Sequence, residues 1–227
     1  FPRGKLWLSA AWRVGRARFR LNSGRVLLTR KVRGELERWR AELSRAEHSG
    51  VPLASRAAIR SCGEPGAGAI YADASGEIGW CAWTVAGEEL LTVSGEWSEA
   101  ERAGLIIAEK ELFASTVGVI ALAQATGMSD AWSFTDNTVA LSAMRSMTPS
   151  TPRMQELAAA RVEWMVEHGV REAAERISTK ANLWADWGSR GKLMDVERQA
   201  QQMGLRVRRV EPPPAWRSAA FLLRVEA

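Results

Sequence analysis

Alternating hydrophobic and polar positions predict three strands in the first part of the main body of the chain. Their sequences are AIYADAS (residues 69–75), EIGWCAWTV (77–85) and ELLTVSGEW (89–97). Ser75-Gly76 and Gly87 separate them, and such short turn segments favour an antiparallel meander.

Helical spacing then alternates with further strands. A long apolar helix is expected from about Ala103 to Thr126, with Gly127 closing it, and it is followed by a strand at 130–136. Two helices come next, one containing 138–147 and one beginning at Pro152 and stopping at Gly169. A strand at 172–178 and a helix at 181–191 complete the order β-β-β-α-β-α-α-β-α. This order predicts an α/β fold, a mixed sheet with helices packed on it.

The two ends of the chain have patterns of their own. At the N-terminal end, a helix is expected from about Thr29 to Gly50, and a linker from Pro52 to Gly68. In the C-terminal tail, a helix closed by Gly204 leads to a strand with arginines at 206, 208 and 209, and then to a proline break. SAAFLLRV (218–225) is expected to add an edge strand or to dock on the core. We therefore expect a basic helical segment at 1–65, a main domain at 66–192 and a helix-strand extension at 193–227.

Charge changes this picture mainly at the N-terminal end. Residues 1–60 carry a net charge of +11, whereas residues 61–227 carry −6. Arginines interleaved with apolar residues are typical of a surface that follows a phosphate backbone, although a solvated basic face is the simpler alternative. The opening FPRGKLWLSAAWR lacks an initiator Met and a convincing signal peptide, which indicates a fragment of a longer polypeptide.

Composition excludes several kinds of protein and site. No uncharged apolar run approaches the roughly 20 residues that a membrane span needs. Cys62 and Cys81 have no CxxC partner and there are only two histidines, which argues against zinc and against a Ser/His/Asp triad. Unpaired thiols predict an intracellular, reducing compartment, cytoplasmic or nuclear. Carboxylate chemistry remains as the main option.

Four acidic residues lie in separate apolar segments, and they are the candidates for that chemistry. They are Asp73 in IYADAS, Glu111 in AEKELFAS, Asp136 in SFTDNT and Asp186 in NLWADWGSR. A buried carboxylate is costly unless it is paired, hydrogen-bonded or bound to a cation. Four converging carboxylates would repel one another, so a shared pair of Mg²⁺ ions is the natural remedy.

Each acid also has a structural alternative. Asp73 precedes a turn and could be a turn residue, while Asp136 precedes a helix and could be its N-cap. Asp186 could be a solvated helix residue, although Asn182 lies one helical turn before it and should share its face. Glu111 competes with Glu109, because residues two apart on a helix point about 200° apart and only one can face the site.

These segments carry a resemblance. YADAS, KELFA, FTDNTVA and the N-x-x-x-D of NLWADWGSR, in this order, resemble the ribonuclease H fold. More narrowly, they look like the ribonuclease H domains of retroelement reverse transcriptases, of the tyrosine-recombinase (DIRS-like) and pararetroviral kinds. The resemblance covers residues 66–192, and its E-L-x-A pattern favours Glu111. The preceding basic segment resembles the connection that follows the polymerase palm, but no paired-aspartate polymerase motif is present. Resolvases and integrases fit less well.

The resemblance implies a metal-dependent endonuclease that hydrolyses the RNA strand of RNA/DNA hybrids within a reverse transcriptase polyprotein. Two Mg²⁺ ions, or Mn²⁺, would be held with Asp73 bridging both, Glu111 and Asp136 on one ion and Asp186 on the other. Six further residues would contact the substrate: Ser75, Asn137, Arg176, Lys180, Asn182 and Arg190.

The chain departs from the cellular members of this family at one position. They carry a His on the loop about ten residues before the last Asp, where this chain has Arg176, with Lys180 nearer; His168 lies at a helix end. A catalytically inactive module that binds nucleic acid or supports a polymerase is therefore the alternative. Among the 11 tryptophans, most, such as those at 80, 83 and 132, are expected in the core, and Trp184 and Trp187 beside Asp186 could line a groove.

Overall fold

The computed structural model describes residues 33, 34, 36, 37, 40, 41, 44, 59–146, 149 and 151–225. The chain separates into two compact units, residues 1–58 and 59–227. The described residues between 33 and 44 are helical, as expected. Residues 59–65 of the predicted basic segment belong to the second unit, and the rest of that segment lies outside the described residues. The description below concerns the second unit.

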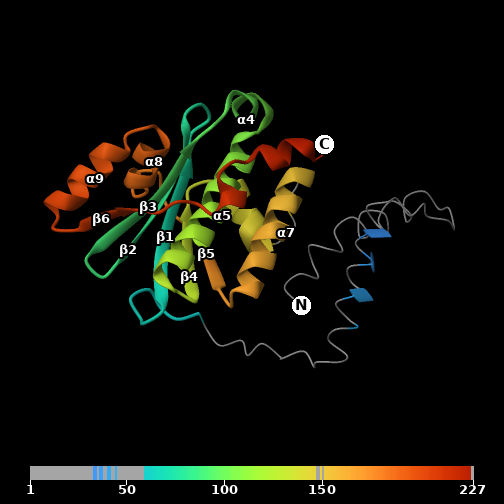
Figure 1. Cartoon of the computed structure of the whole chain (residues 1–227), viewed down its shortest axis with the longest axis horizontal. Helices are drawn as coiled ribbons and strands as arrows, with labels where there is room; N and C mark the ends of the chain where they lie inside the picture. The colour runs from blue at the N-terminus through green and yellow to red at the C-terminus, as the bar shows by residue number, and fades with distance from the viewer. Residues whose placement is uncertain are drawn as a thin grey trace. The chain divides into compact units, whose positions relative to one another are not determined.

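A six-stranded mixed sheet forms the centre of this unit (Figure 1). Its strand order is β5-β4-β1-β2-β3-β6; β1, β2 and β3 are antiparallel, whereas β4 runs parallel to β1, β5 to β4 and β6 to β3. The strands are β1 (Ala67–Ala74), β2 (Gly79–Ala86), β3 (Glu89–Glu96), β4 (Asp130–Thr135), β5 (Arg171–Arg176) and β6 (Arg206–Arg209).

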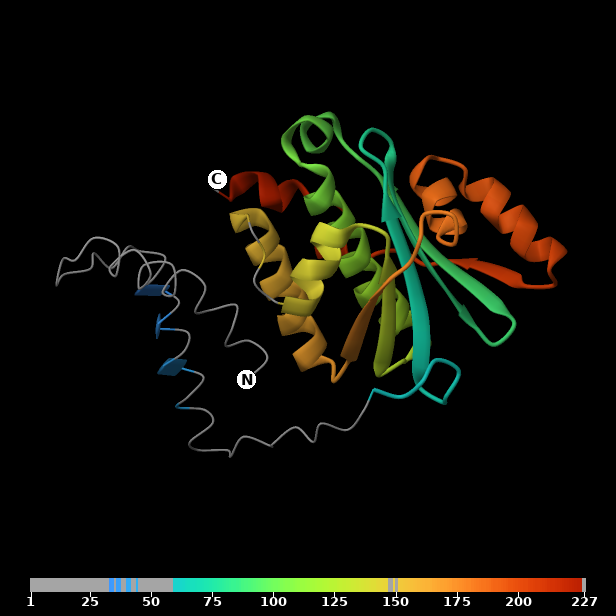
Figure 2. The same cartoon turned by 180° about the vertical axis from the view of Figure 1, so that it is seen from behind.

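Helices cover both faces of the sheet. Figure 2 shows α5 and α7 on one side and α8 and α9 on the other. The helices are α4 (Glu99–Gly104), α5 (Ile107–Thr126), α6 (Thr138–Ser146), α7 (Pro152–Glu167), α8 (Leu183–Ser189) and α9 (Leu193–Gln202), with short 3-10 turns η1 (Pro214–Trp216) and η2 (Ala220–Arg224). Three antiparallel strands followed by parallel ones, flanked by helices, confirm the expected ribonuclease H-like fold class.

The helix expected from Ala103 begins later, at Ile107, because two capping interactions divide the segment. The Glu101 carboxylate accepts a hydrogen bond from the backbone N–H of Ser98 and caps α4. Leu105 is extended and ends α4. The Glu109 carboxylate then accepts from the Ile106 N–H at 3.2 Å at the start of α5.

Helix α5 forms the centre of the core. It is buried from Ala108 to Ala123, so it has no single apolar face to orient it. At Gly118 it approaches the sheet so closely that an added Cβ would lie 2.7 Å from the Ala82 Cβ. Among the described helices, none is long and apolar enough to cross a membrane.

The C-terminal tail packs on the same unit. The strand expected around Arg206–Arg209 is the edge strand β6, and SAAFLLRV docks on the core instead of adding another strand. Leu222 is fully buried, and the Glu101 carboxylate accepts hydrogen bonds from Ser218 Oγ and the Ala219 N–H. Of the two expectations for residues 218–225, docking on the core is therefore the correct one.

Candidate metal centre

Three carboxylates converge at one end of the sheet. Asp73 is near the end of β1, Asp136 directly follows β4, and Glu111 lies in the second turn of α5. Because β1 and β4 are parallel with Tyr71 paired to Phe134, the two aspartates lie at the same edge. One carboxylate oxygen of each of the three residues lies within 4.8 Å of the others.

Burial and mutual repulsion make this cluster electrostatically unfavourable without a cation. Asp73 and Glu111 are each only 5% exposed. Burial, together with the charges of Asp73 and Asp136, raises the pKa of Glu111 to about 9, against a hydrogen bond from the Ala74 backbone. Burial also raises the pKa of Asp73 to about 6, against a hydrogen bond from Ser189.

These donors suit a hard divalent cation. All are carboxylate oxygens, the ligands that Mg²⁺ prefers. Glu111 Oε2 is buried and has no hydrogen-bond partner among the described residues. A buried acceptor without a donor is costly, so an ion bound there would satisfy it. The residues present therefore fit a divalent metal.

Asp186, the fourth acid, lies near this cluster but outside its tight group. Its Oδ1 accepts from Nε of Arg190, the C-cap residue of α8, at 2.7 Å. Its charge nevertheless contributes to raising the pKa of both Asp73 and Glu111, so it is within electrostatic reach. Arg190 is 56% exposed at its side chain, and it neutralises Asp186 from the solvent side.

Asp136 is not the N-cap of α6, and Asp73 is not the residue that organises the turn after β1. The N-cap of α6 is Asn137, whose Oδ1 accepts from the N–H groups of residues 139 and 140 at 3.0 Å. Asp136 instead accepts from Thr179 Oγ1 at 2.5 Å. Asp73 lies within β1, and the following turn is organised by Ser75, whose Oγ accepts from the N–H groups of residues 78 and 79.

Glu109 points to a different environment from Glu111. Its carboxylate accepts from the Ile106 N–H and from Thr151 Oγ1, and it lies 3.7 Å from Arg153 Nη1. Glu111 is therefore the glutamate of α5 that faces Asp73 and Asp136.

Three of the expected substrate contacts have structural partners within the fold. Besides organising the turn, Ser75 donates to the Ser189 carbonyl at 2.8 Å. Asn182 is 1% exposed and donates to the Ala72 carbonyl, which fixes the start of α8 against β1. Asn137 caps α6. Their contact with a substrate stays a prediction.

The other three expected contacts are exposed basic residues on the β5–α8 side: Arg176, Lys180 and Arg190. Sequence reasoning missed Ser189, which is fully buried and donates through Oγ to Asp73 Oδ2 at 2.5 Å. It also missed Thr179. Ser189 follows Asp186 by three residues on α8, so its place on a helix that packs on β1 was the only available signal.

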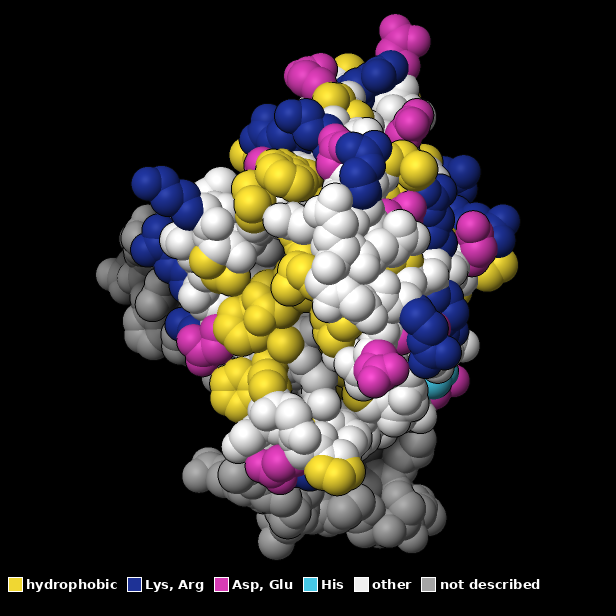
Figure 3. Space-filling model, turned by 90° about the vertical axis from the view of Figure 1, so that its left-hand side faces the viewer, with side chains coloured by type: hydrophobic (Ala, Val, Ile, Leu, Met, Phe, Trp, Pro, Cys, Tyr) yellow, Lys and Arg dark blue, Asp and Glu magenta, His cyan; other side chains and the backbone are white. Residues whose placement is uncertain are grey.

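Aromatic rings cover the sheet face that carries α8. Tyr71 stacks on Trp83 of β2 at a centroid distance of 4.2 Å and on Phe134 of β4 at 4.9 Å, and Trp83 contacts Trp184 of α8 at 5.1 Å. Figure 3 views this side of the molecule and shows hydrophobic side chains gathered beside Lys and Arg. Trp80 is buried as expected, whereas Trp83 is only half-buried.

No protein-family model matches the chain, and no curated protein matches it. Five chains among the solved structures are similar to it, including the following two. One is ribonuclease H1 from the halophilic archaeon Halobacterium salinarum NRC-1, with 12% identity, covering 57% of this chain and 98% of that one, at a TM-score of 0.45. The other is the N-terminal ribonuclease H domain of Rv2228c from Mycobacterium tuberculosis, solved as a fusion with maltose-binding protein, with 14% identity, 55% and 97% coverage and a TM-score of 0.46. The fold assignment itself rests on the strand order and directions described above.

Proposed function

We propose that the chain is a divalent-metal-dependent nuclease that hydrolyses the RNA strand of RNA/DNA hybrids, as part of a retroelement reverse transcriptase. The observation that carries this proposal is the convergence of Asp73, Glu111 and Asp136 from three separate elements, with oxygens within 4.8 Å. Such a cluster is electrostatically costly without a cation, since the charges of Asp73 and Asp136 both raise the pKa of Glu111.

Each residue of the cluster has a distinct task in this proposal. The charges of Asp136 and Asp186 both act on Asp73, and Ser189 orients its carboxylate, so Asp73 is suited to contact both ions of a pair. Glu111 offers a buried oxygen without a donor, and Asp136 is oriented by Thr179. Asp186 would hold the second ion once Arg190 turns aside. A bound Mg²⁺ or Mn²⁺ supplies Lewis acidity and a water of lowered pKa for attack on a phosphodiester.

The choice of substrate rests on the resemblance of the four motifs and on charge. Hybrids are recognised through backbone shape and 2′-hydroxyl groups more than through base edges. The net charge of +11 on residues 1–60 supports binding of a phosphate backbone. Arg176, the last residue of β5, pairs with Thr135 next to Asp136, and Lys180 follows Thr179, which donates to Asp136. Both basic residues are exposed and add positive charge on this side.

Cleavage of a labelled RNA/DNA hybrid by the full chain tests this proposal. Mg²⁺ or Mn²⁺ should support cleavage of the RNA strand, and Asp73→Asn and Asp136→Asn should each abolish it. Glu109→Gln is the matched control, because it removes a buried carboxylate of α5 outside the cluster. Cleavage that persists in both aspartate variants would refute the assignment of the site.

A second candidate is a catalytically silent module that binds nucleic acid or supports a polymerase. Two features favour this second candidate. The fourth acid, Asp186, is already paired with Arg190, and Arg176 stands where the cellular enzymes have a His. Arg190→Ala separates the two candidates. Under the nuclease proposal this variant cuts hybrids under at least one metal; a silent module binds hybrids and never cuts them, with or without Arg190.

A further inference from the structure

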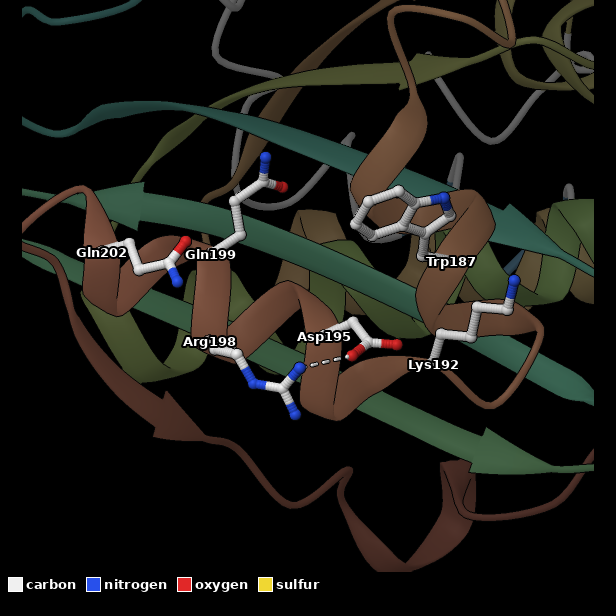
Figure 4. Close-up of a pocket in the computed structure, with 6 residues that line it drawn as sticks. All are labelled: Trp187, Lys192, Asp195, Arg198, Gln199 and Gln202. Carbon is white, nitrogen blue, oxygen red and sulfur yellow. Dashed lines mark hydrogen bonds and ion pairs between the residues drawn. The ribbon is translucent and has the colours of Figure 1, made fainter.

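A hollow lies between α8 and α9 (Figure 4). These helices cover the face of the sheet opposite to α5 (Figure 2). The volume of the hollow is about 440 Å³. One aromatic ring and five polar side chains line it: Trp187, Lys192, Asp195, Arg198, Gln199 and Gln202. None of these residues belongs to the carboxylate cluster.

The amphipathic pattern of α9 creates this hollow. Val196 and Ala200 are fully buried against Leu90 of β3 and fix one side of the helix to the sheet. The other side of the helix carries polar residues that line the hollow: Asp195, Arg198, Gln199 and Gln202. Gly191, with φ of +76°, makes the turn between the two helices, and the Lys192 N–H donates to the Trp187 carbonyl at 2.9 Å.

The side chains of the hollow are partly fixed and partly free. Gln199 Oε1 accepts from the indole N–H of Trp184 at 2.6 Å, which orients the Gln199 amide. Arg198 pairs with Asp195 at 3.2 Å, so these two charges offset each other. Lys192 and Gln202 are exposed, and neither side chain has a hydrogen-bond partner within the described part of the chain. The net charge of the hollow is therefore positive and comes from Lys192.

The half-buried indole of Trp187 supplies the apolar surface. On one side it packs against the cluster of Leu90, Val196 and Ala200, which holds the ring in place. Figure 4 shows the ring at one end of the hollow near Lys192, with Gln199 and Gln202 toward the other end. A fixed aromatic ring, amides that can pair with a base edge and an ammonium for a phosphate are together the chemistry that recognises a nucleotide.

We propose that this hollow binds one nucleotide of a single-stranded extension of the nucleic acid held at the carboxylates. The inference rests on the proposed function, and it adds a second contact outside the cleavage site. Trp187 directly follows Asp186 in α8, so the hollow adjoins the helix that carries the fourth acid. The base stacks on Trp187, the amides of Gln199 and Gln202 contact its edge, and Lys192 contacts a phosphate.

Binding of blunt and extended hybrids tests this inference. The full chain carrying Asp136→Asn, which should not cut, is titrated by fluorescence anisotropy with a blunt hybrid and with hybrids extended by a few unpaired nucleotides at either end. Trp187→Leu and Lys192→Gln are compared with Arg224→Gln, which removes an exposed charge from η2, an element that contacts α4 and α7 on the other side of the sheet.

We expect tighter binding of one extended hybrid than of the blunt one. Trp187→Leu should lower the affinity for the extended hybrid by about fivefold or more, as expected for loss of one base–aromatic stack. Its affinity for the blunt hybrid should not change. Lys192→Gln should lower the slope of log affinity against log salt by about 0.7, the loss of one phosphate contact to a single strand. Arg224→Gln should change neither the affinity for the extended hybrid nor the salt slope.

Crosslinking provides a readout that does not depend on a variant folding. A photoreactive thiouridine in the extension should crosslink to a peptide within residues 183–202. Equal affinity for blunt and extended hybrids, or crosslinks confined to other segments, would overturn the inference and leave the proposed function intact. Failure to bind even the blunt hybrid would overturn the proposed function as well.

Discussion

Replacing Glu111 with glutamine should stabilise the metal-free chain relative to the parent as the pH rises from 4.5 to 7. The variant keeps the shape of the side chain and removes a carboxyl group whose pKa is raised to about 9 in the folded chain. An acid with a raised pKa stays protonated when folded and releases its proton on unfolding. The unfolded state is thereby favoured as the pH rises through the interval between the two pKa values.

The size of this effect follows from the two pKa values. The ordinary value for Glu is 4.5, and the folded value is about 9. Stability linked to Glu111 is fully present below pH 4.5 and is lost progressively as the pH rises toward 9. Each pH unit in this interval costs about 1.4 kcal/mol, so the parent should lose about 3 kcal/mol between pH 4.5 and 7 that the variant retains.

Urea unfolding in the presence of EDTA, followed by tryptophan fluorescence, measures this difference. At each pH, the unfolding free energy of the parent is subtracted from that of the variant. The change of this difference with pH is the quantity to compare, because any effect of the substitution that does not depend on pH cancels. Glu109→Gln is the matched control. It removes a carboxylate that accepts two hydrogen bonds and lies near Arg153, so it should destabilise the chain by about 1 kcal/mol at pH 7.

Millimolar Mg²⁺ extends the same test. A cation bound at the carboxylates stabilises the folded parent by mass action, and Glu111→Gln should reduce this stabilisation while Glu109→Gln should not. A difference between Glu111→Gln and the parent that stays constant from pH 4.5 to 7 would show that Glu111 is ionised or solvated in the folded chain. The reasoning about a cluster short of positive charge would then be refuted.

Three further predictions concern the fold that positions the cluster. Glu172→Gln should lower the free energy of unfolding by about 3 kcal/mol, because it leaves the buried guanidinium of Arg161 without its ion-pair partner; urea unfolding at pH 7 measures it. Leu222→Ala should cost about 2 to 3 kcal/mol in the same assay, and no loss would contradict docking of the tail on the core. Gly188→Ala should lower the melting temperature, because its Cβ would overlap the Cys81 side chain, and Cys81→Ala in the same chain should recover part of the loss.

The strands and most helix boundaries could be predicted because they depend on local chemistry. One or two residues are enough to predict the turns at Ser75-Gly76 and Gly87 and the helix ends at Gly127 and Gly169. The last three of these glycines have positive φ in the structure. The start of α5 could not be placed in the same way. It depends on Glu109 reaching back to the Ile106 N–H, and a glutamate in an apolar helix gives no sign of this choice.

The site was only partly accessible to sequence reasoning. Motif order selected the three acids whose oxygens the structure brings together, but periodicity could not separate Glu109 from Glu111 in a helix buried on almost every side. Adjacent residues posed a similar difficulty at the end of β4. Asp136 and Asn137 are both good caps, and only the fold shows that Asn137 takes that role. Ser189 and Thr179 act through contacts across long sequence separations, which no local pattern contains.

Asp186 shows how one local pair can set the state of the whole site. Arg190 lies four residues later, at the C-cap of the same helix, a spacing at which an acid and a base attract each other without any tertiary contact. Exposed pairs of this kind contribute little stability, so the pair can open at low cost when a divalent cation competes for the carboxylate. Asp73 and Glu111 both gain from that exchange, because the charge of Asp186 that raises their pKa would then be offset by the ion. On the proposed function, Asp73, Glu111 and Asp136 would form the permanent part of the metal centre, and Asp186 would join it when an ion binds.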